Sequence, residues 1–171
     1  MPIPEFVVEL RKHIGHAELW LSGVTGVVTD DEKSRVLLVK RADNGEWTPI
    51  TGIIDPGEQP ANAAAREALE EANVRVEPVR VVSLDSVGPV KYPNGDVSRY
   101  LDISFHMRYL SGDLRPADGE NSEVRWFDAD DLPPMNERFR TVVANVLADP
   151  QPTIFEFDAE EVERTAELPG N

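Results

Sequence analysis

The sequence predicts an α/β sandwich in which helices flank a mixed sheet. Three observations predict this class: short runs rich in Val, Ile and Leu recur along the chain, turn signals join several of them into hairpins, and helical segments lie between them. A chain of 171 residues corresponds to one domain with short extensions. We therefore expect a single domain over residues 1–148 and an acidic extension over residues 149–171.

The first 50 residues are expected to form a helix and then a hairpin. Apolar residues recur at helical spacing over residues 4–14, which predicts a helix within an N-terminal segment that covers about residues 1–16. Strand-forming runs over residues 19–28 and 35–41 are separated by polar residues, which is typical of a hairpin. The segment after them is expected to lie at a sheet edge, because Pro49 cannot occupy a central strand.

The strongest helical signal covers residues 61–72, which include six alanines. Pro60 suits the first position of such a helix, and Asn73 suits a left-handed residue at its C-terminal end. The preceding residues 52–57 contain several turn formers and are expected to be a loop. This loop and this helix carry most of the residues that indicate a chemical function.

The second half of the chain is expected to contain three strands and a closing helix. Strands are predicted over residues 79–87, 101–109 and 123–127, and a strong turn signal separates the first two. In the middle strand apolar and polar residues alternate, so we expect one face of it to be buried and the other to be exposed. Residues 136–147 predict an amphipathic helix. The residues from 149 onward carry seven acids and one base, which predicts a peripheral extension.

The composition excludes several classes of function. Lys and Arg number 17 and Asp and Glu number 32, so the net charge is −15, which opposes binding to nucleic acid polymers or anionic membranes. The chain has no cysteine, which removes disulfides, thiolate catalysis and cysteine zinc sites. It has no apolar run of the ~20 residues that cross a membrane and no secretory signal at Met1. We therefore expect a cytoplasmic protein with a small-molecule partner.

Three carboxylates are grouped on the strongest predicted helix. At ~100° per residue, Glu67, Glu70 and Glu71 fall within a ~100° arc, while alanines and Leu69 fill the opposite face. We expect the alanine face to pack on the sheet and the carboxylates to lie on the other side. Glu67 and Glu71 repel each other in an isolated helix, but a hard divalent cation between them would attract both. Most acidic helix faces are merely solvated, so the arrangement alone does not establish a metal site.

The loop before this helix supplies the context that favours a function. Gly52 is followed after five residues by Glu58 and, after seven more, by Arg66, whose guanidinium can form a bidentate pair with a carboxylate. This spacing, together with the residues up to Val74, resembles the Nudix box, with Asn73 where the box usually has Gly. The resemblance covers most of the chain and implies the Nudix type of α/β/α sandwich, with a mixed sheet and a catalytic loop–helix–loop.

The resemblance also implies an activity and a set of site residues. Nudix hydrolases use Mg²⁺ or Mn²⁺ to cleave a pyrophosphate bond in a nucleoside diphosphate linked to another group. Carried over by position, Glu67, Glu70 and Glu71 would be the metal ligands, and Gly52 or its neighbour would add a backbone carbonyl. Glu67 is also a candidate for orienting or deprotonating water. The ion pair that Glu58 forms with Arg66 would hold the loop on the helix.

Further candidates lie outside the box. The family often places another carboxylate in the loop before the last strand, and we assign this role to Glu120 rather than Glu123, because Glu123 begins the predicted strand. Arg41 and Arg99 are candidate phosphate contacts. ADP-ribose and other nucleoside diphosphate sugars, nucleoside triphosphates and dinucleoside polyphosphates are all possible substrates.

Two alternatives stand beside the hydrolase hypothesis. One is a module of the same fold that senses a nucleotide without turning it over, although such a module has no need for all three carboxylates. The other is an acidic structural protein whose carboxylates are incidental. We also expect a homodimer, in which the N-terminal segment or the acidic tail contributes to the interface, and we favour the N-terminal segment because its apolar face needs a partner.

Overall fold

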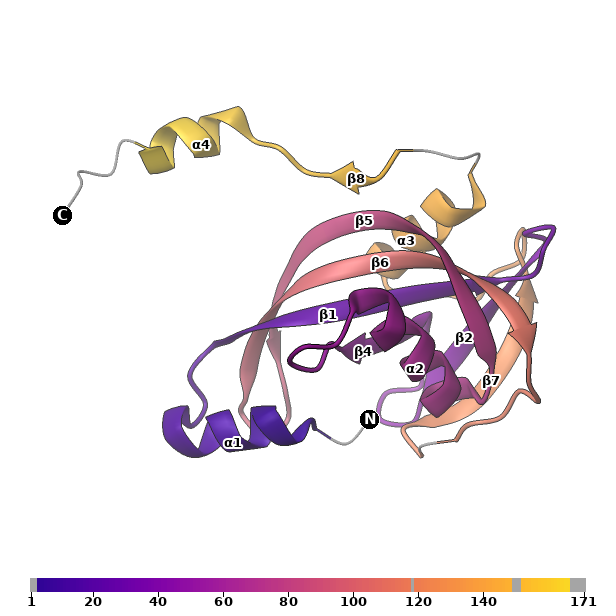
Figure 1. Cartoon of the computed structure of the whole chain (residues 1–171), viewed down its shortest axis with the longest axis horizontal. Helices are drawn as coiled ribbons and strands as arrows, with labels where there is room; N and C mark the ends of the chain where they lie inside the picture. The colour runs from indigo at the N-terminus through magenta and orange to yellow at the C-terminus, as the bar shows by residue number, and fades with distance from the viewer. Residues whose placement is uncertain (1–2, 118, 149–151, 167–171) are drawn as a thin grey trace.

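A twisted mixed sheet carries a helix on each face in the computed structural model, which describes residues 3–117, 119–148 and 152–166 (Figure 1). In chain order the elements are α1 (Glu5–Ile14), β1 (Leu19–Thr29), β2 (Arg35–Arg41), β3 (Trp47–Thr48), β4 (Ile50–Ile53), α2 (Pro60–Ala72), β5 (Arg75–Lys91), β6 (Val97–Ser111), β7 (Asn121–Asp128), α3 (Glu137–Leu147), β8 (Ile154–Phe155) and α4 (Ala159–Ala166). Within the described residues the sheet has eight strands in the order β3-β2-β1-β6-β5-β8, with β4 paired to β1 and β7 to β2.

The mixed character of the sheet comes from β1. This strand pairs in parallel with β6 along its whole length and in antiparallel with both β4 and β2. The predicted hairpin of β1 and β2 is confirmed, and so is the hairpin of β5 and β6, which turns over residues 92–96. Gly52 and Ile53 lie in β4, so the expectation that the loop begins at Gly52 was wrong. The loop begins at Ile54 instead, where the backbone N–H donates to Ser22 of β1 at 3.0 Å.

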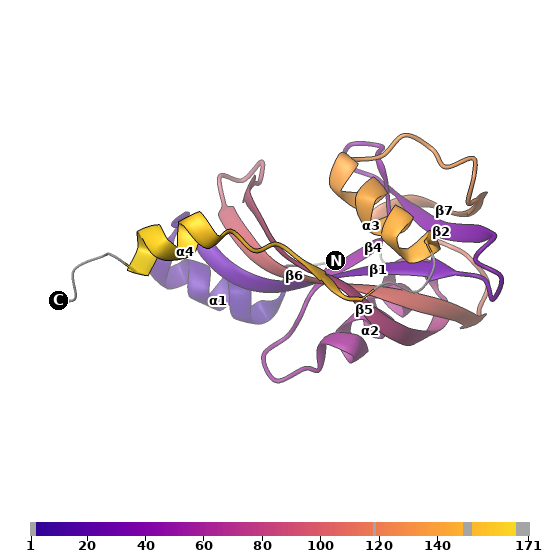
Figure 2. The same ribbon diagram turned by 90° about the horizontal axis from the view of Figure 1, so that it is seen from above.

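Two apolar cores lie on opposite faces of the sheet, one under α2 and one under α3 (Figures 1 and 2). Because successive residues of a strand point to opposite faces, Val28 of β1 packs in the α2 core and Val27 in the α3 core. The alanines of α2 are small enough to bring this helix close to the sheet. As expected, α2 ends at a left-handed Asn73, with φ 57° and ψ 38°.

The polar face of β6 is buried, which corrects the expectation of an exposed face. Asp102, Ser104 and His106 are each covered, because α3 and its neighbours lie over this side of the sheet. The buried groups satisfy one another: Ser104 Oγ donates to Asp102 at 3.1 Å, and His106 Nε2 lies 2.9 Å from Thr29 Oγ1. Alternation of polar and apolar residues therefore marks two buried faces here rather than one.

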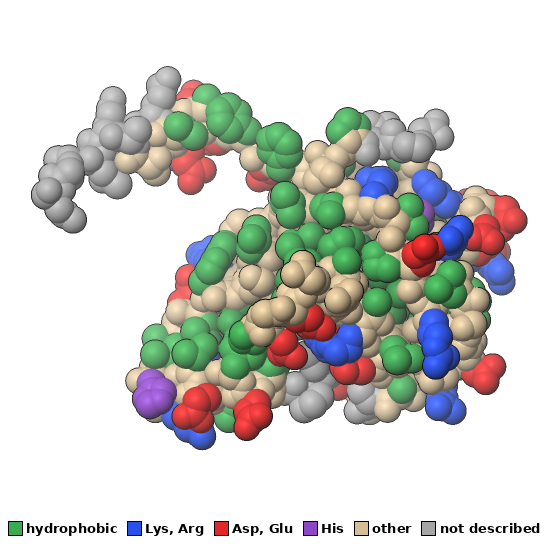
Figure 3. All heavy atoms as spheres, viewed as in Figure 1, with side chains coloured by type: hydrophobic (Ala, Val, Ile, Leu, Met, Phe, Trp, Pro, Cys, Tyr) green, Lys and Arg blue, Asp and Glu red, His purple; other side chains and the backbone are tan. Residues whose placement is uncertain are grey.

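The outer elements lie around this centre. Figure 2 shows α1 at the end of the sheet where β5 and β6 turn, and α4 projecting beyond β8. β8 pairs in parallel with β5 at Ser83 and Leu84 only. Figure 3 shows hydrophobic side chains gathered on this face of the molecule. Trp20 of β1, Leu84 of β5 and Leu101 of β6 are among the exposed apolar residues of the sheet. No helix of the described residues is long and apolar enough to span a bilayer.

Candidate functional site

Two of the three predicted carboxylates lie on the buried face of α2. The side chain of Glu67 is 0% exposed and that of Glu71 is 5% exposed, whereas Glu70 faces solvent. The expected separation of an alanine face from a carboxylate face was therefore wrong. With 3.6 residues per turn, positions 67 and 71 fall between the buried alanines of the preceding turns, and Leu69 points outward with 43% exposure. The sheet beneath α2 thus has to accommodate two carboxylates.

Gly52 provides the space for one of them. A Cβ atom built on Gly52 would lie 2.2 Å from Glu67 Cδ, so the carboxyl group of Glu67 rests directly against the backbone of β4. Any side chain at position 52 would occupy the volume that this carboxyl group fills. β4 is held in place by its antiparallel pairing with β1, in which Gly52 lies opposite Val24. The glycine therefore has a steric function within a strand, not the turn-forming function that the sequence indicated.

Arg66 connects the loop to the carboxylates of the helix. Its Nε and Nη2 donate to the two oxygens of Glu58 at 2.9 Å each, which is the bidentate pair expected from the sequence. Its Nη1 donates to Glu67 at 2.8 Å and to Glu70 at 3.2 Å. Its Nη2 also reaches the backbone carbonyl of Ile53 at 3.2 Å. One guanidinium thus fixes the loop, the end of β4 and two of the acidic side chains.

Two of the acids that Arg66 contacts, Glu58 and Glu67, have pKa values shifted in opposite directions. The hydrogen bond from Arg66 lowers the pKa of Glu58. Burial raises the pKa of Glu67 to about 7, although the charge of Arg66 acts in the opposite direction. One Glu67 oxygen accepts from Arg66, while the other is buried without a hydrogen-bond donor among the described residues. Burial without a donor favours either a proton or a cation at this oxygen.

The residues at this site fit a hard divalent cation, although they do not form a closed cage. Carboxylate oxygens are the ligands that Mg²⁺ and Mn²⁺ prefer. The Glu67 oxygen next to Gly52 is the one that accepts from Arg66, and the other Glu67 oxygen is buried without a donor among the described residues. Among the described residues, no three acidic or histidine side chains are positioned to hold a metal ion as they stand. Glu70 contacts Arg66 and would have to turn to join the other carboxylates.

A cavity of about 550 Å³ lies beside these carboxylates and collects most of the predicted residues. Gly52, Glu71, Arg41 and Glu120 all line it, although they come from four different parts of the chain. Arg41 pairs with Asp43 at 2.6 Å, which raises the pKa of its guanidinium, and the charge of Glu71 adds to this effect. The backbone carbonyl of Glu120 accepts from Ala42 at 2.8 Å, which holds the loop before β7 next to the end of β2.

Three predicted residues are absent from the lining of the cavity: Glu67, Glu70 and Arg99. Of these, Arg99 also lies away from α2, on β6. Its guanidinium donates to Glu18 at 2.8 Å and to the carbonyl of Gly88 at 3.1 Å. Its role as a phosphate contact stays a prediction, but these contacts connect β6 to the residue before β1 and to β5. Glu123 pairs with Lys40 of β2 at 2.7 Å and is absent from the cavity lining, which includes Glu120. The choice of Glu120 over Glu123 as the further carboxylate stays a prediction.

Sequence reasoning missed the cavity wall on the α3 side. Arg138 of α3 forms an ion pair with Asp102 at 2.7 Å and donates to Thr25 Oγ1 at 2.9 Å, and all three residues line the cavity. Asp102 lies in a strand in which polar and apolar residues alternate, and this pattern predicts that its side chain faces solvent. Arg138 lies 36 positions further along the chain, and nothing in their spacing connects the two residues.

The sequence of the chain matches one family model and is similar to several known proteins. The family model described as NUDIX domain matches residues 20–148. An NAD-capped RNA hydrolase NudC of Pseudomonas syringae is 30% identical over 113 residues, which are 60% of this chain and 38% of the relative. The chain therefore matches less than half of the length of that relative. The NudC of Vibrio cholerae is 30% identical over 128 residues, covering 72% of this chain and 45% of that protein.

Solved structures show the same architecture. A NUDIX hydrolase from Nitrosomonas europaea is 28% identical, with a TM-score of 0.58, over 74% of this chain and 70% of that one. An ADP-ribose pyrophosphatase from Streptococcus suis shares the fold at 23% identity and a TM-score of 0.60, over 78% of this chain and 96% of that one. The sequence match covers most of the chain and includes Gly52, Arg66 and the carboxylates of α2. The chain belongs to the Nudix family.

Proposed function

We propose that this chain is a metal-dependent hydrolase that cleaves a pyrophosphate bond in a nucleoside diphosphate linked to another group. The observation that carries the proposal is the burial of Glu67 and Glu71 beside Gly52, next to a cavity large enough for a nucleotide. Burying two acids close together is costly unless a positive charge accompanies them. Arg41 in the same cavity provides a cation for the phosphate groups of a substrate.

Nudix hydrolases generally need divalent metal ions. We assign Mg²⁺ or Mn²⁺ to Glu67, Glu70 and Glu71, with a backbone carbonyl at or next to Gly52. The ion, when bound, supplies positive charge to the diphosphate oxygens and lowers the pKa of a coordinated water. Glu70 is exposed and is held by a single contact of 3.2 Å with Arg66, so its side chain can turn toward the other two.

The residues of the chain itself then have separate tasks. Arg66 fixes the orientation of Glu67, and Glu58 fixes Arg66 in turn, which keeps the loop and the helix in register. Glu67 is a candidate for orienting or deprotonating the attacking water, because its carboxylate is buried and fixed by Arg66. Glu120 is the second candidate for this task, because it lines the cavity from the loop directly before β7.

The names of the relatives narrow the substrates to be tested. Those names include NAD-capped RNA hydrolases, an ADP-ribose pyrophosphatase and a UDP-X diphosphatase. A nucleoside diphosphate joined to a second group is common to all three. We expect this chain to prefer a small nucleotide such as NAD or ADP-ribose over a capped RNA, because its net charge of −15 opposes binding of the RNA body.

The test is a turnover assay on a panel of substrates. ADP-ribose, NAD, an NAD-capped oligonucleotide, a UDP-sugar, a nucleoside triphosphate and a dinucleoside polyphosphate are each incubated with Mg²⁺ or Mn²⁺, and the products are separated by chromatography. We expect hydrolysis of at least one, and loss of that activity in Glu67→Gln but not in Glu123→Gln. Tight binding of a nucleotide without any turnover would favour the sensing alternative instead.

We also propose a homodimer and an acidic extension to the domain. The apolar residues Val8, Leu10 and Ile14 of α1 are exposed and support an interface with a second copy, which light scattering at micromolar concentration can test. Residues 149–171 form an acidic extension to the domain, of which residues 152–166 are described. The cytoplasmic location stays a prediction.

A further inference from the structure

We propose that α1 and the tip of the β5–β6 hairpin form a compartment for the nucleobase of the substrate, and that Arg11 is the positioning residue that holds this compartment together. The proposal rests on the function proposed above, because it concerns the same cavity. It adds the part of the substrate that this wall recognises and the residue that builds the wall.

The lining of the cavity combines two kinds of residue. Glu71, Arg41 and Glu120 line it together with Gly52, and this set suits a diphosphate and its cation. Apolar side chains from the segment before α1, from α1, from β1 and from β5 with the turn after it also line the cavity: Ile3, Val7, Leu21, Val87, Val90 and Pro93. Apolar side chains of this kind favour a flat, weakly hydrated group over a sugar or a phosphate. The two kinds of lining thus match the two parts of a nucleotide.

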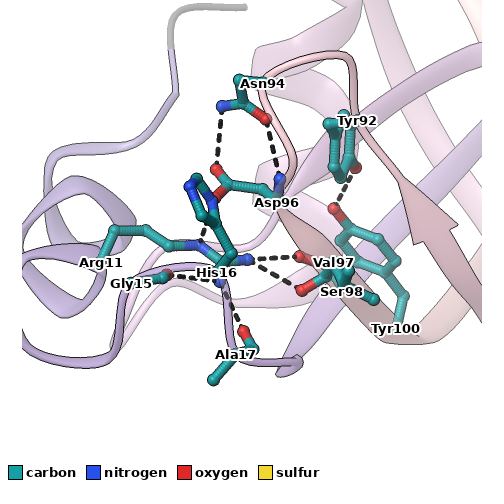
Figure 4. A network of polar contacts seen from close by, with 10 residues as sticks. All are labelled: Arg11, Gly15, His16, Ala17, Tyr92, Asn94, Asp96, Val97, Ser98 and Tyr100. Carbon is teal, nitrogen blue, oxygen red and sulfur yellow. Dashed lines mark hydrogen bonds and ion pairs between the residues drawn. The ribbon is translucent and has the colours of Figure 1, made fainter.

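The same cavity is also lined by polar groups that can hydrogen-bond to the edge of a base. The hydroxyls of Tyr92 and Tyr100 hydrogen-bond to each other at 2.5 Å, and both residues line the cavity (Figure 4). Only one of the two protons is used in that bond, so the other can be donated to an acceptor on a ligand. Asn94 and Ser98 line the same region. A nucleobase has the planar faces and the hydrogen-bonding edge that such a surface recognises.

Arg11 ties α1 to the hairpin (Figure 4). Its Nη1 donates to the carbonyls of Gly15 at 3.0 Å and Ala17 at 2.5 Å, which fixes the chain that leaves the helix. Its Nη2 donates to the carbonyl of Val97 at 2.8 Å and to Ser98 Oγ at 3.3 Å, both on β6. Both terminal nitrogens of the guanidinium are therefore occupied by acceptors of the chain itself, so its role is to position the wall rather than to bind phosphate.

Charged contacts complete the connection. Arg11 Nε lies 3.4 Å from a carboxylate oxygen of Asp96, and His16 Nδ1 lies 2.8 Å from the same oxygen. Asn94 Nδ2 donates to the other oxygen of Asp96 at 3.0 Å. The turn of the hairpin, the end of α1 and the linker to β1 therefore converge on one arginine–aspartate pair, as Figure 4 shows.

Apolar packing alone holds α1 weakly. Of its described side chains only Val7 is buried, with 5% exposure, and several other apolar side chains of this helix face solvent. The polar contacts of Arg11 therefore supply much of what keeps the wall in place. The residues that match the family model begin at 20, so α1 lies outside the part of the chain that this family model covers. The preference for a base would therefore depend on α1, which precedes the part of the chain that matches the family model.

The test compares ligands that differ by a base. Binding of AMP, GMP, CMP and UMP to the full chain is measured by calorimetry without metal, with ribose 5-phosphate as the base-free reference. We expect at least one mononucleotide to bind about tenfold or more tightly than ribose 5-phosphate. Arg11→Ala should remove most of this preference, while Lys12→Ala should keep it, because Lys12 is exposed and contacts only Glu9 among the described residues.

Two further measurements separate a positioning role from a general loss of structure. For a substrate that the enzyme hydrolyses, Arg11→Ala should raise KM about tenfold and leave kcat within about twofold. The reason is that the residues proposed for the diphosphate and its cation are unchanged. Val90→Phe keeps all contacts of Arg11 and fills the compartment instead, so it should abolish the preference even if Arg11→Ala unfolds.

The proposal fails if the wild-type chain binds ribose 5-phosphate as tightly as every mononucleotide, or if Val90→Phe leaves the preference intact. It also fails if a folded Arg11→Ala variant behaves like Lys12→Ala. Because these binding measurements need neither metal nor turnover, their failure is distinct from a failure of the proposed hydrolase activity. A chain that discriminates between bases without hydrolysing any substrate would support the compartment and contradict the hydrolase.

Discussion

Replacing Gly52 with alanine tests the contact on which the proposed metal site depends. The new Cβ would lie 2.2 Å from Glu67 Cδ, whereas real Cβ atoms essentially never approach other heavy atoms closer than 3.0 Å. The carboxyl group must therefore move by at least the difference, 0.8 Å. It cannot do so freely, because Arg66 holds one of its oxygens at 2.8 Å. We expect Glu67 to lose either its place or its contact with Arg66.

The expected cost can be divided between activity and stability. A displacement of about 1 Å at a reacting group costs on the order of 100-fold in rate, which corresponds to about 3 kcal/mol in the activation free energy. Crowding of a packed interior costs about 1–3 kcal/mol in the free energy of unfolding. We therefore expect Gly52→Ala to remain folded, to melt at a somewhat lower temperature, and to lose about two orders of magnitude in kcat/KM.

Gly26→Ala is the matched control, because it lies on the paired strand β1 and also creates a clash. Its Cβ would lie 2.1 Å from Met107 Cε, the end of a flexible side chain that can change its rotamer. This variant should lose stability to a similar extent but keep its turnover, measured with the same substrate at saturating Mg²⁺. If a folded Gly52→Ala keeps more than about half of the wild-type rate, the site as described here is wrong.

Three further predictions concern single groups. Glu71→Gln should keep the fold and lower turnover about 100-fold or more, while Glu123→Gln, whose carboxylate pairs with Lys40, should change the steady-state rate little. Complete chelation should abolish hydrolysis, and added Mg²⁺ or Mn²⁺ should restore it; an unchanged rate after chelation would contradict the metal assignment. Burial lowers the pKa of His106 to about 4 from an ordinary 6.5, so below pH 6.5 the unfolded chain takes up a proton that the folded chain does not. Unfolding free energy should fall by about 2 kcal/mol from pH 7 to pH 5 through this group, and denaturant titrations should show a smaller fall in His106→Gln.

Much of the fold follows from local patterns. The strands over residues 19–28 and 35–41 were predicted by β-rich runs, and the alanine-rich helix by propensity and by Pro60 at its start. Asn73 has the left-handed conformation that its position after the helix indicated. These features depend on neighbours in sequence, so a single chain without its structure contains enough information to predict them.

The orientation of α2 could not be predicted in the same way. Helical spacing shows which residues share a face, but it does not show which polar residues the sheet can accept. The answer depends on Gly52, whose missing side chain leaves room for the carboxyl group of Glu67. Gly52 was assigned to a loop from its sequence neighbours, so its contact with a residue 15 positions later was not foreseen.

The buried polar face of β6 was missed for a related reason. An aspartate in an alternating strand is solvated unless a distant residue supplies partners, and here those partners are Arg138 of α3 and Thr25 of β1. Both the ion pair and the hydrogen bond join residues from different elements. Local patterning predicts that a strand forms, but tertiary packing determines whether its polar face meets water.

Comparison of two of the buried carboxylates, Glu67 and Asp102, shows why Glu67 is the better candidate for chemistry. Asp102 accepts from Arg138 at 2.7 Å, from Thr25 at 3.1 Å and from Ser104 at 3.1 Å, so both of its oxygens have donors. Glu67 accepts only from Arg66 among the described residues, and its second oxygen is buried without a donor. A satisfied acid is part of the wall, because further charge beside it gains little. An acid with one oxygen without a donor costs stability in the isolated fold and gains most from a cation, so Glu67 rather than Asp102 is the acid that we propose for the metal.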